Sequence, residues 1–437
     1  MEHGMIEILK EIILDGQESE QNTGVQRHLN IETVTGKATV CIGVRRSGKS
    51  TFMRQIIARL ISQGTSATNI VMINFFDDRL HFLKEYGLGL VTEAYYQLYP
   101  EKKNRETVYF FFDEIQAIPR WELFVERLMR TEMCQVYITG SSAQMLSRDI
   151  ATPMRGRSVS WEMFPFSFQE FLDARGIEVK YHLTSRNRLR IQNCFEDYWR
   201  NGGFPELMDA SDALRVKIHQ EYFQSILYRD LVERHDIAHP NALRDLALHL
   251  IDNAGSLYSI NRVYGLLKSL DHKLQKSAVA QYIEWMEDSY FLFSVRLYDA
   301  SFSRSKANPK KIYCIDHAMV TSISSGILVN SGHLLENLIF SALRRTTADI
   351  FYYRTATGKE VDFLTLIGRK EKRLVQVCDT MIDEKTRKRE LSALLEAMAE
   401  QDITESIVVT RNQSETIEAE GRIIQLVPVW KFLLEFR

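Results

Sequence analysis

Residues 39–51 read Thr-Val-Cys-Ile-Gly-Val-Arg-Arg-Ser-Gly-Lys-Ser-Thr, and this stretch decides the fold of the N-terminal part of the chain. A short β-branched, apolar run leads into Gly43. After four intervening residues come Gly48, Lys49 and Ser50, and then apolar residues at helical spacing. Strand, glycine loop and helix in this order are the context that a P-loop requires. Glycine lets backbone N–H groups approach phosphate oxygens closely, because no Cβ is in the way.

The residue types in this loop predict how a triphosphate is held. We expect the ammonium of Lys49 to reach the β- and γ-phosphates and the hydroxyl of Ser50 to ligate Mg²⁺. A plain glycine turn before an ordinary helix is the alternative, and the lysine, the hydroxyl and the flanking elements together disfavour it. The residues expected to contact the nucleotide are Gly43, Arg45, Arg46, Ser47, Gly48, Lys49, Ser50 and Thr51.

A second signal lies at residues 108–114. The run from Val108 to Phe112 is apolar throughout, which predicts a buried central strand, and it ends in Asp113 and Glu114. Ligands bind at the carboxyl ends of such strands. We therefore expect Asp113 to join the Mg²⁺ shell and Glu114 to orient or deprotonate the attacking water. The alternative is a solvated acidic turn after the strand. The P-loop earlier in the same sheet disfavours this alternative.

Length and composition limit the remaining classes. At 437 residues the chain should hold two to four domains, and its net charge of -2 argues against nucleic-acid binding through overall basicity, although a local patch stays open. The five cysteines form no C-x-x-C pair, so neither a zinc site nor a disulfide framework is indicated. The acidic N-terminus and the lack of a long apolar run predict a cytoplasmic protein.

The segment 30–169 alternates apolar strands with helical stretches, which is typical of a mainly parallel sheet covered on both faces. Ser141 follows the fourth predicted strand, where its hydroxyl could contact the γ-phosphate or the attacking water; a glycine-serine turn explains it equally well. The strands that we expect are 39–43, 70–75, 108–112, 135–139 and 158–164.

Taken as a set, the motifs resemble a prokaryotic AAA-type ATPase family whose members carry a C-terminal domain called DUF4143. The N-terminal motifs are Gly-Val-Arg-Arg-Ser-Gly-Lys-Ser-Thr, Phe-Phe-Asp-Glu-Ile-Gln, Ile-Thr-Gly-Ser-Ser-Ala and Phe-Pro-Phe-Ser-Phe-Gln-Glu-Phe, beginning at residues 43, 111, 138 and 164. Further matches lie at 202–205, 228–230, 311–313, 334–337 and 360–363. The resemblance implies an ATP- and Mg²⁺-binding domain with Walker A and Walker B motifs.

The resemblance also suggests a role for Arg157. An arginine at this place could lie against the phosphates of its own subunit or reach a neighbour's site as a finger. A surface arginine beside a strand is the alternative.

The domain layout that we expect has five parts. They are an N-terminal helical leader at 1–29, the AAA-type P-loop core at 30–169, a helical lid at 170–238, a winged helix-turn-helix at 239–300 and a restriction-endonuclease-like domain at 301–437. Three helices followed by a strand pair suggest the winged helix. Its third helix carries little positive charge, so DNA reading and a protein-binding role both stay open. A basic loop at 301–311, with Lys310 and Lys311, is a candidate for phosphate contacts or a solvated charge run.

The last domain resembles the PD-(D/E)xK nuclease fold, whose members gather Mg²⁺ and the attacking water with carboxylates and a lysine. The resemblance carries these positions onto Glu336, Asp362, Gln376 and Cys378. Cysteine cannot supply a fixed positive charge, and the neutral amide of Gln376 weakens a site for a hard cation. We therefore expect a degenerate nuclease fold, with residual Mg²⁺-dependent cutting as the alternative.

These observations predict a Mg²⁺-dependent ATPase whose nucleotide state is passed to the C-terminal modules, acting on DNA or as a regulatory switch. A nucleotide-gated protein-interaction switch without DNA binding and an ATP-dependent nuclease are the rival hypotheses. The partners that we expect are ATP and either DNA or a protein, with no membrane; self-association stays open.

Overall fold

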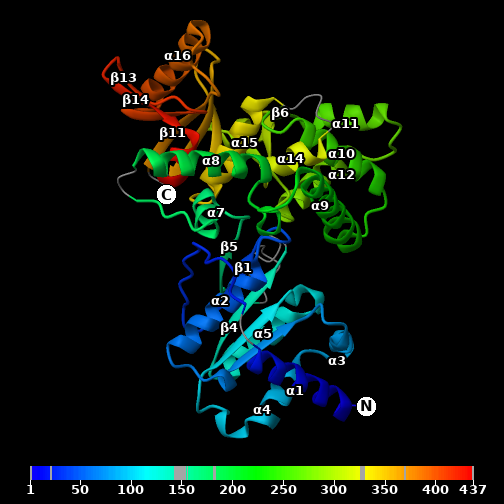
Figure 1. The fold of residues 1–437 in the computed structure, drawn as a ribbon. Helices are drawn as coiled ribbons and strands as arrows, with labels where there is room; N and C mark the ends of the chain where they lie inside the picture. The colour runs from blue at the N-terminus through cyan, green and yellow to red at the C-terminus, as the bar shows by residue number, and fades with distance from the viewer. Residues whose placement is uncertain are drawn as a thin grey trace. The chain divides into compact units, whose positions relative to one another are not determined.

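The computed structural model describes residues 2–19, 22–141, 154, 156–180, 184–324, 330–368 and 371–435. The chain forms two compact units, Met1–Met163 and Phe164–Arg437, which we describe one at a time (Figure 1). Ser142, part of the third N-terminal motif, lies outside the described residues.

The first unit is built on a five-stranded sheet in the order β2-β3-β4-β1-β5, with every neighbouring pair parallel. The five predicted strands are all present, and the sheet with its helices matches a P-loop NTPase fold. The strands are β1 (Ala38–Ile42), β2 (Ile70–Asn74), β3 (Val108–Asp113), β4 (Cys134–Gly140) and β5 (Ser158–Glu162).

Helices cover both faces of this sheet. Successive side chains of β3 point to opposite faces, so its aromatic residues contact helices on both sides. Phe111 packs in one apolar cluster with residues of α2. Phe110 contacts Tyr95 of α4, and Phe112 contacts Phe124 of α5, with ring centroids 6.1 Å apart in each pair. The helices are α1 (Glu2–Glu18), α2 (Lys49–Ser62), α3 (Leu83–Tyr86), α4 (Gly89–Leu98) and α5 (Trp121–Thr131), with 3₁₀ turns at Ala67–Asn69, Asp78–Leu80, Pro100–Lys102 and Ile115–Ala117.

The second unit begins with helices and ends in α/β structure. The first helices are α7 (Phe168–Ala174), α8 (Ser185–Asn201), a 3₁₀ turn at Pro205–Leu207, α9 (Asp212–Ser225) and a π-helical stretch at Ile226–Glu233. Later helices are α10 (Pro240–Asp252), α11 (Ile260–Ser269), α12 (Lys276–Asp288), α13 (Phe302–Ala307), α14 (His317–Ile323), α15 (Ser331–Arg344), α16 (Glu384–Gln401) and α17 (Val429–Glu435).

One nine-stranded sheet runs through the second unit in the order β13-β14-β12-β11-β10-β9-β7-β8-β6. It continues across the domain boundary expected at residue 300, because β7 pairs in parallel with β9 through Arg296↔Phe351 and Leu297↔Tyr352. The strands are β6 (Leu257–Tyr258), β7 (Leu292–Leu297), β8 (Lys310–Cys314), β9 (Ile350–Arg354), β10 (Glu360–Ile367), β11 (Glu371–Val377), β12 (Glu405–Thr410), β13 (Glu415–Ala419) and β14 (Arg422–Pro428).

The segment expected to form a winged helix holds three helices and contributes to a small antiparallel arrangement. Its elements follow one another as α10, β6, α11, α12 and β7. Strand β8, which lies beyond the boundary expected at residue 300, pairs with both β6 and β7. The prediction of a basic loop at 301–311 is wrong, because these residues form α13 and the start of β8.

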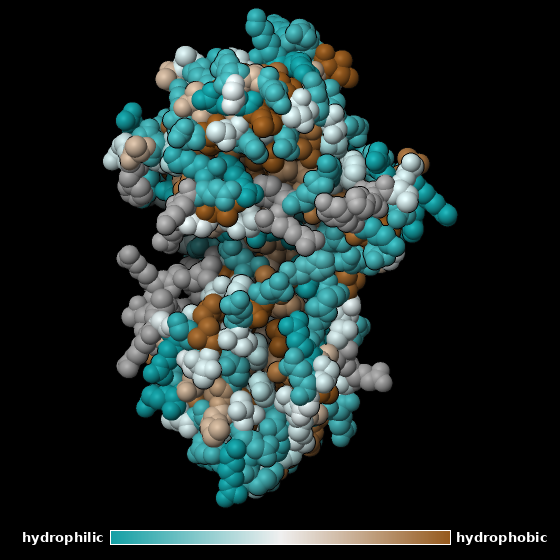
Figure 2. Space-filling view, turned by 90° about the vertical axis from the view of Figure 1, so that its left-hand side faces the viewer, coloured by the Kyte–Doolittle hydropathy of each residue, from teal (hydrophilic) through white to brown (hydrophobic). Residues whose placement is uncertain are grey.

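Hydrophilic residues cover most of the face that Figure 2 shows, and hydrophobic residues lie among them in small groups. Within the described residues, no helix combines the length and the apolar character needed to cross a membrane.

Candidate functional site

The glycines of the P-loop occupy positions that other residues could not take without strain. Gly43 has a φ of 152°, and a Cβ there would lie 2.0 Å from the carbonyl oxygen of Met163. This crowding arises because the chain after β5 pairs closely with the end of β1, where Met163 N–H donates to Ile42 O at 2.7 Å. Gly48, with φ 96°, is the N-cap of α2 and has no side chain to cap it. The N–H groups that begin α2 can therefore face an anion.

The side chains of the loop are buried around this position. Lys49 is 4% exposed, and its ammonium donates to the carbonyl oxygens of Gly43 and Val44 at 3.0 Å each. The hydroxyl of Ser47 is buried and, within the described part of the chain, has no hydrogen-bond partner. A buried hydroxyl without a partner is unfavourable unless a ligand satisfies it. This observation fits a phosphate at the loop.

The hydroxyl and carboxylate expected to hold a metal ion lie side by side. Ser50 Oγ, in the first turn of α2, donates to Asp113 Oδ2 at 2.7 Å. Asp113 ends β3 and is 1% exposed. Burial raises the pKa of Asp113, while hydrogen bonds from Thr139 and Ser50 oppose that rise. A buried carboxylate beside a serine hydroxyl is a suitable donor set for Mg²⁺, whose charge would offset the cost of burying the anion.

Thr139, near the end of β4, is a positioning residue that the sequence did not reveal. Its hydroxyl donates to Asp113 Oδ1 and accepts the backbone N–H of Glu114 at 3.1 Å. Glu114 itself has a left-handed backbone with φ 55°, and its carboxylate accepts a hydrogen bond from Gln116. The threonine thus ties together the two acidic residues that follow the central strand.

Ser141 lies at the same edge of the sheet as the P-loop. The register pairs Ile42 at the end of β1 with Gly140 at the end of β4, so the residues that follow these two strands are neighbours. Ser141 is fully buried. Its place is compatible with the expected role near a γ-phosphate.

Arg157 lies elsewhere. Its carbonyl accepts the N–H of Ala38, at the beginning of β1, whereas the P-loop follows the end of that strand. Since a strand rises by about 3.3 Å per residue, the two ends of this five-residue strand are roughly 13 Å apart. The guanidinium lies 3.5 Å from Glu126 of α5. We therefore propose no contact of Arg157 with the P-loop of its own chain; a role as a finger in a neighbouring subunit stays a prediction.

The leader contributes Arg27, which the sequence did not single out. Arg27 is 6% exposed, and its guanidinium donates to the carbonyl oxygen of Ser47 inside the P-loop. Its backbone N–H donates to Gln55 of α2 at 3.1 Å, and Gln55 in turn donates to the carbonyls of Thr23 and Val25. Segment 23–27 is thereby fixed against the loop and the helix that follows it.

The second unit brings together two of the four nuclease-like positions, Glu336 on α15 and Asp362 on β10. Lys311 of β8 lies between them, with its ammonium 2.8 Å from Glu336 Oε1 and 2.8 Å from Asp362 Oδ1. The expectation that Lys311 contacts phosphates from a solvated loop is wrong, because this side chain is 4% exposed and ion-paired.

Gln376 and Cys378 do not complete a metal site around those carboxylates. The amide of Gln376 donates to Glu390 at 2.7 Å and accepts the N–H of Asp362 at 3.1 Å. Cys378 donates to the carbonyl of Thr380, and burial raises the pKa of its thiol to about 11. A neutral thiol supplies neither a charge nor a good ligand.

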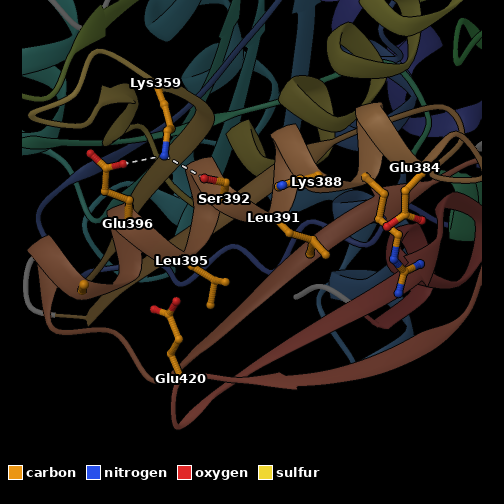
Figure 3. A pocket seen from close by; sticks show the side chains of 10 residues that line it. Lys359, Glu384, Lys388, Leu391, Ser392, Leu395, Glu396 and Glu420 are labelled. Atoms are coloured by element: carbon orange, nitrogen blue, oxygen red, sulfur yellow. Dashed lines mark hydrogen bonds and ion pairs between the residues drawn. The ribbon is translucent and has the colours of Figure 1, made fainter.

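A groove of about 610 Å³ lies along α16, and Figure 3 shows its lining. Lys359 donates to Ser392 at 2.7 Å and pairs with Glu396 at 2.8 Å. Arg387 pairs with Glu415. With two of its basic residues neutralised, this groove is poorly suited to bind a phosphate.

Three sequence families match consecutive parts of the chain. An AAA domain matches residues 35–172, a domain of unknown function (DUF8612) matches residues 192–327, and a second domain of unknown function (DUF4143) matches residues 331–432.

Two relatives align with this chain over nearly their full length. An uncharacterized protein of Methanocaldococcus jannaschii is 31% identical over 441 residues, which covers 98% of this chain and 96% of the relative. An uncharacterized protein of Haemophilus influenzae is 28% identical over 399 residues, covering 91% and 94%.

Solved structures give weaker likenesses. The Aeropyrum pernix ORC1 protein in complex with DNA has 14% identity and a TM-score of 0.30, covering 75% of this chain and 92% of that one. AMPPCP-bound DnaA from Aquifex aeolicus has 12% identity and a TM-score of 0.28, covering 64% and 86%. With TM-scores this low, these two likenesses support no conclusion about this chain. The family matches and the relative from Methanocaldococcus jannaschii, in contrast, show that the chain belongs to the family that joins an N-terminal AAA domain to a C-terminal DUF4143 domain.

Proposed function

We propose that this chain is a Mg²⁺-dependent ATPase. The observation that carries the proposal is the 2.7 Å hydrogen bond between Ser50 and Asp113, which joins the P-loop helix to the end of the buried central strand. These two residues would hold Mg²⁺, and Lys49 would bind the β- and γ-phosphates. When bound, the metal ion neutralises charge that develops on the transferred phosphoryl group.

The remaining predicted residues take supporting parts. The backbone N–H groups from Gly43 to Thr51 would surround the phosphates, and the Ser47 hydroxyl would gain a partner there. Glu114 would orient or deprotonate the attacking water, with Thr139 fixing its backbone. Ser141 would contact the γ-phosphate or that water.

ATP turnover by the full chain tests this proposal. Glu114→Gln should lower kcat by about 100-fold or more while ATP affinity changes little, because the carboxylate acts on water rather than on the nucleotide. Lys49→Ala should remove ATP binding itself. Glu93→Gln, at an exposed acidic residue of α4, is the matched control and should leave kcat unchanged. Undiminished turnover in Glu114→Gln would contradict the assignment.

We further propose that α10, α11 and α12 with β6, β7 and β8 form a winged helix-turn-helix that contacts DNA. The strand order β6-β8-β7 and the three preceding or intervening helices support this proposal. Three exposed lysines lie in and beside the turn between α11 and α12: Lys268 is in the last turn of α11, Lys273 is in the turn between the helices and Lys276 begins α12. A groove of about 830 Å³ lies at this turn, lined in part by Lys268 and Lys273. These lysines replace the expected basic loop as the candidate phosphate contacts.

Duplex binding across a salt series tests the DNA part. Replacing Lys268, Lys273 and Lys276 by alanine should flatten the plot of log K against log salt by about 0.9 per lost phosphate contact. The control replaces Lys84, Lys103 and Lys217, which are also exposed, and should leave the slope unchanged. No duplex binding by the wild type at low salt would favour the rival hypothesis, a nucleotide-gated switch that acts on a protein partner. If the DNA part holds, ATP turnover should rise with duplex, since we propose that nucleotide state is passed to this segment through the helices of the expected lid.

A further inference from the structure

The cluster around Lys311 contains more charge than the sequence suggested. Besides Glu336 and Asp362, the Glu360 carboxylate lies 3.1 Å from the same ammonium. Tyr313, two residues along β8, donates its hydroxyl to Glu336 Oε1 at 2.6 Å. Lys311 and Tyr313 lie on one face of β8 because side chains alternate along a strand. One strand thus supplies both groups that partner the carboxylates.

The ammonium of Lys311 lies within 3.1 Å of an oxygen of each of the three carboxylates. The other oxygen of Glu360 also pairs with the guanidinium of Arg354, at 3.2 Å. Burial would lower the pKa of Lys311, but Asp362, Tyr313, Glu336 and Glu360 outweigh this effect and raise it well above its usual value. Burial and the charge of Asp362 raise the pKa of Glu336. The lysine therefore stays charged, and the buried acids depend on it for compensation.

A divalent ion does not fit this arrangement. Mg²⁺ and Ca²⁺ need several oxygen ligands at about 2.0–2.6 Å, with the carboxylates converging on the ion. Here Glu336 Oε1 and Asp362 Oδ1 converge on the nitrogen of Lys311. The other oxygen of Asp362 accepts the N–H of Val377 at 3.0 Å. In the part of the chain that the structure describes, no group of three or more His, Cys, Asp and Glu side chains is placed to hold a metal ion.

We propose that the ammonium of Lys311 takes the place of a divalent cation in this carboxylate cluster, so that the cluster binds no metal ion while Lys311 is present. Removing the ammonium leaves Glu336, Asp362 and Glu360 as a site for Mn²⁺ or Mg²⁺. In the wild-type protein the cluster serves as a structural link inside the second unit. It connects β8 to α15 and β10, across sequence separations of 25 and 51 residues.

This link matters because few backbone pairs connect the part of the sheet formed by β6, β8 and β7 to the part formed by β9 to β14. The parallel ladder of β7 and β9 consists of Arg296↔Phe351 and Leu297↔Tyr352. The buried ion cluster stabilises this short ladder. A buried carboxylate that loses its donor is strongly destabilising, so the cluster holds β8, α15 and β10 in one arrangement.

The test counts Mn²⁺ ions bound per chain by electron paramagnetic resonance, without nucleotide. Any ion at the P-loop is common to all variants and cancels in the comparison. Lys311→Met should bind one more Mn²⁺ than the wild type, and its melting temperature should fall in EDTA and recover in Mn²⁺. Lys311→Met combined with Glu336→Gln and Asp362→Asn should bind no extra ion and should not respond to Mn²⁺. An unchanged count in folded Lys311→Met would overturn the proposal.

A second comparison does not depend on the folding of Lys311→Met. The wild type and the double variant Glu336→Gln with Asp362→Asn should bind equal numbers of Mn²⁺ ions, because the proposal gives the wild-type cluster none. If the wild type binds one ion more than this variant, the carboxylates already hold a metal beside Lys311, and the proposal is wrong.

Discussion

Thr139 and Asp113 come from adjacent parallel strands and are joined by a hydrogen bond from the threonine hydroxyl to Asp113 Oδ1. The same hydroxyl accepts the N–H of Glu114. A single side chain on β4 therefore contacts both the carboxylate of the proposed metal ligand and the backbone of Glu114, the proposed general base.

We expect Thr139→Val to lower ATP turnover by about 10- to 100-fold, the usual effect of removing a group that orients a metal ligand. Thr139→Ser keeps the hydroxyl and should retain most activity. Steady-state kinetics against Mg²⁺ concentration make the comparison. If valine and serine behave alike, the hydroxyl does not position the carboxylate.

Gly43→Ala should prevent the first unit from folding normally, because its Cβ would meet the Met163 carbonyl oxygen at 2.0 Å. Backbone atoms cannot move aside as a flexible side chain can. Gly16→Ala is the matched control: its Cβ would make an ordinary 3.6 Å contact with Met72 O, and α1 should gain up to about 1 kcal/mol in stability. Thermal unfolding of both variants checks this difference, and equal melting temperatures would contradict it.

Arg27→Gln should weaken both the fold of the P-loop and ATP affinity, since the charged donor to Ser47 O is lost. Hydrogen bonds to charged groups contribute about 1.5–3 kcal/mol. Gln26→Ala, at an exposed neighbouring position, should change neither property. Denaturant unfolding and binding of a fluorescent nucleotide measure the two effects; wild-type affinity in Arg27→Gln would show that the leader does not support the loop.

The second unit should lose stability in mild acid. Burial lowers the pKa of His219 from 6.5 to about 4, with Asp316 opposing this and Arg215 and His317 adding to it. The folded state thus keeps His219 neutral where the unfolded chain binds a proton. Stability is complete above pH 6.5 and falls as the pH drops towards 4, by about 2 kcal/mol between pH 6.5 and 5 for this histidine.

His219→Asn should reduce that loss, because the side chain no longer titrates, while asparagine can still bond to Ser322, which lies 2.8 Å from His219 Nδ1. Gln220→Asn, at the exposed neighbour, serves as the control for the substitution itself. Urea unfolding at several pH values gives the slopes. An identical slope in His219→Asn and the wild type would assign the acid sensitivity to other groups.

The sheet of the first unit could be predicted because its signals are local. The apolar run ending at Phe112 is too hydrophobic for an exposed strand, and the glycines at 43 and 48 mark the loop by their spacing alone. The winged-helix segment was predicted from helix order, but strand β6, with two residues, is too short to leave a signal.

The partners of the acidic residues could not be predicted, because they depend on pairing across long sequence separations. Thr139 lies 26 residues from Asp113, and Lys311 lies 51 residues from Asp362. The adjacent lysines at 310 and 311 look equivalent in the sequence, and only the register of β8 decides which of them is buried. A useful signal was present in Lys311 and Tyr313, two residues apart in a strand, where one face combines a cation with a hydroxyl.

The ion cluster also couples the evolution of two segments of this chain. Lys311 belongs to the segment matched by DUF8612, whereas Glu336, Glu360 and Asp362 belong to the segment matched by DUF4143. A recombination event that exchanged one segment for that of a distant relative would bring together carboxylates and a β8 strand that had not been selected for each other. The two segments are therefore expected to pass through evolution as one unit, with a change at position 311 tolerated only alongside changes among its three acidic partners.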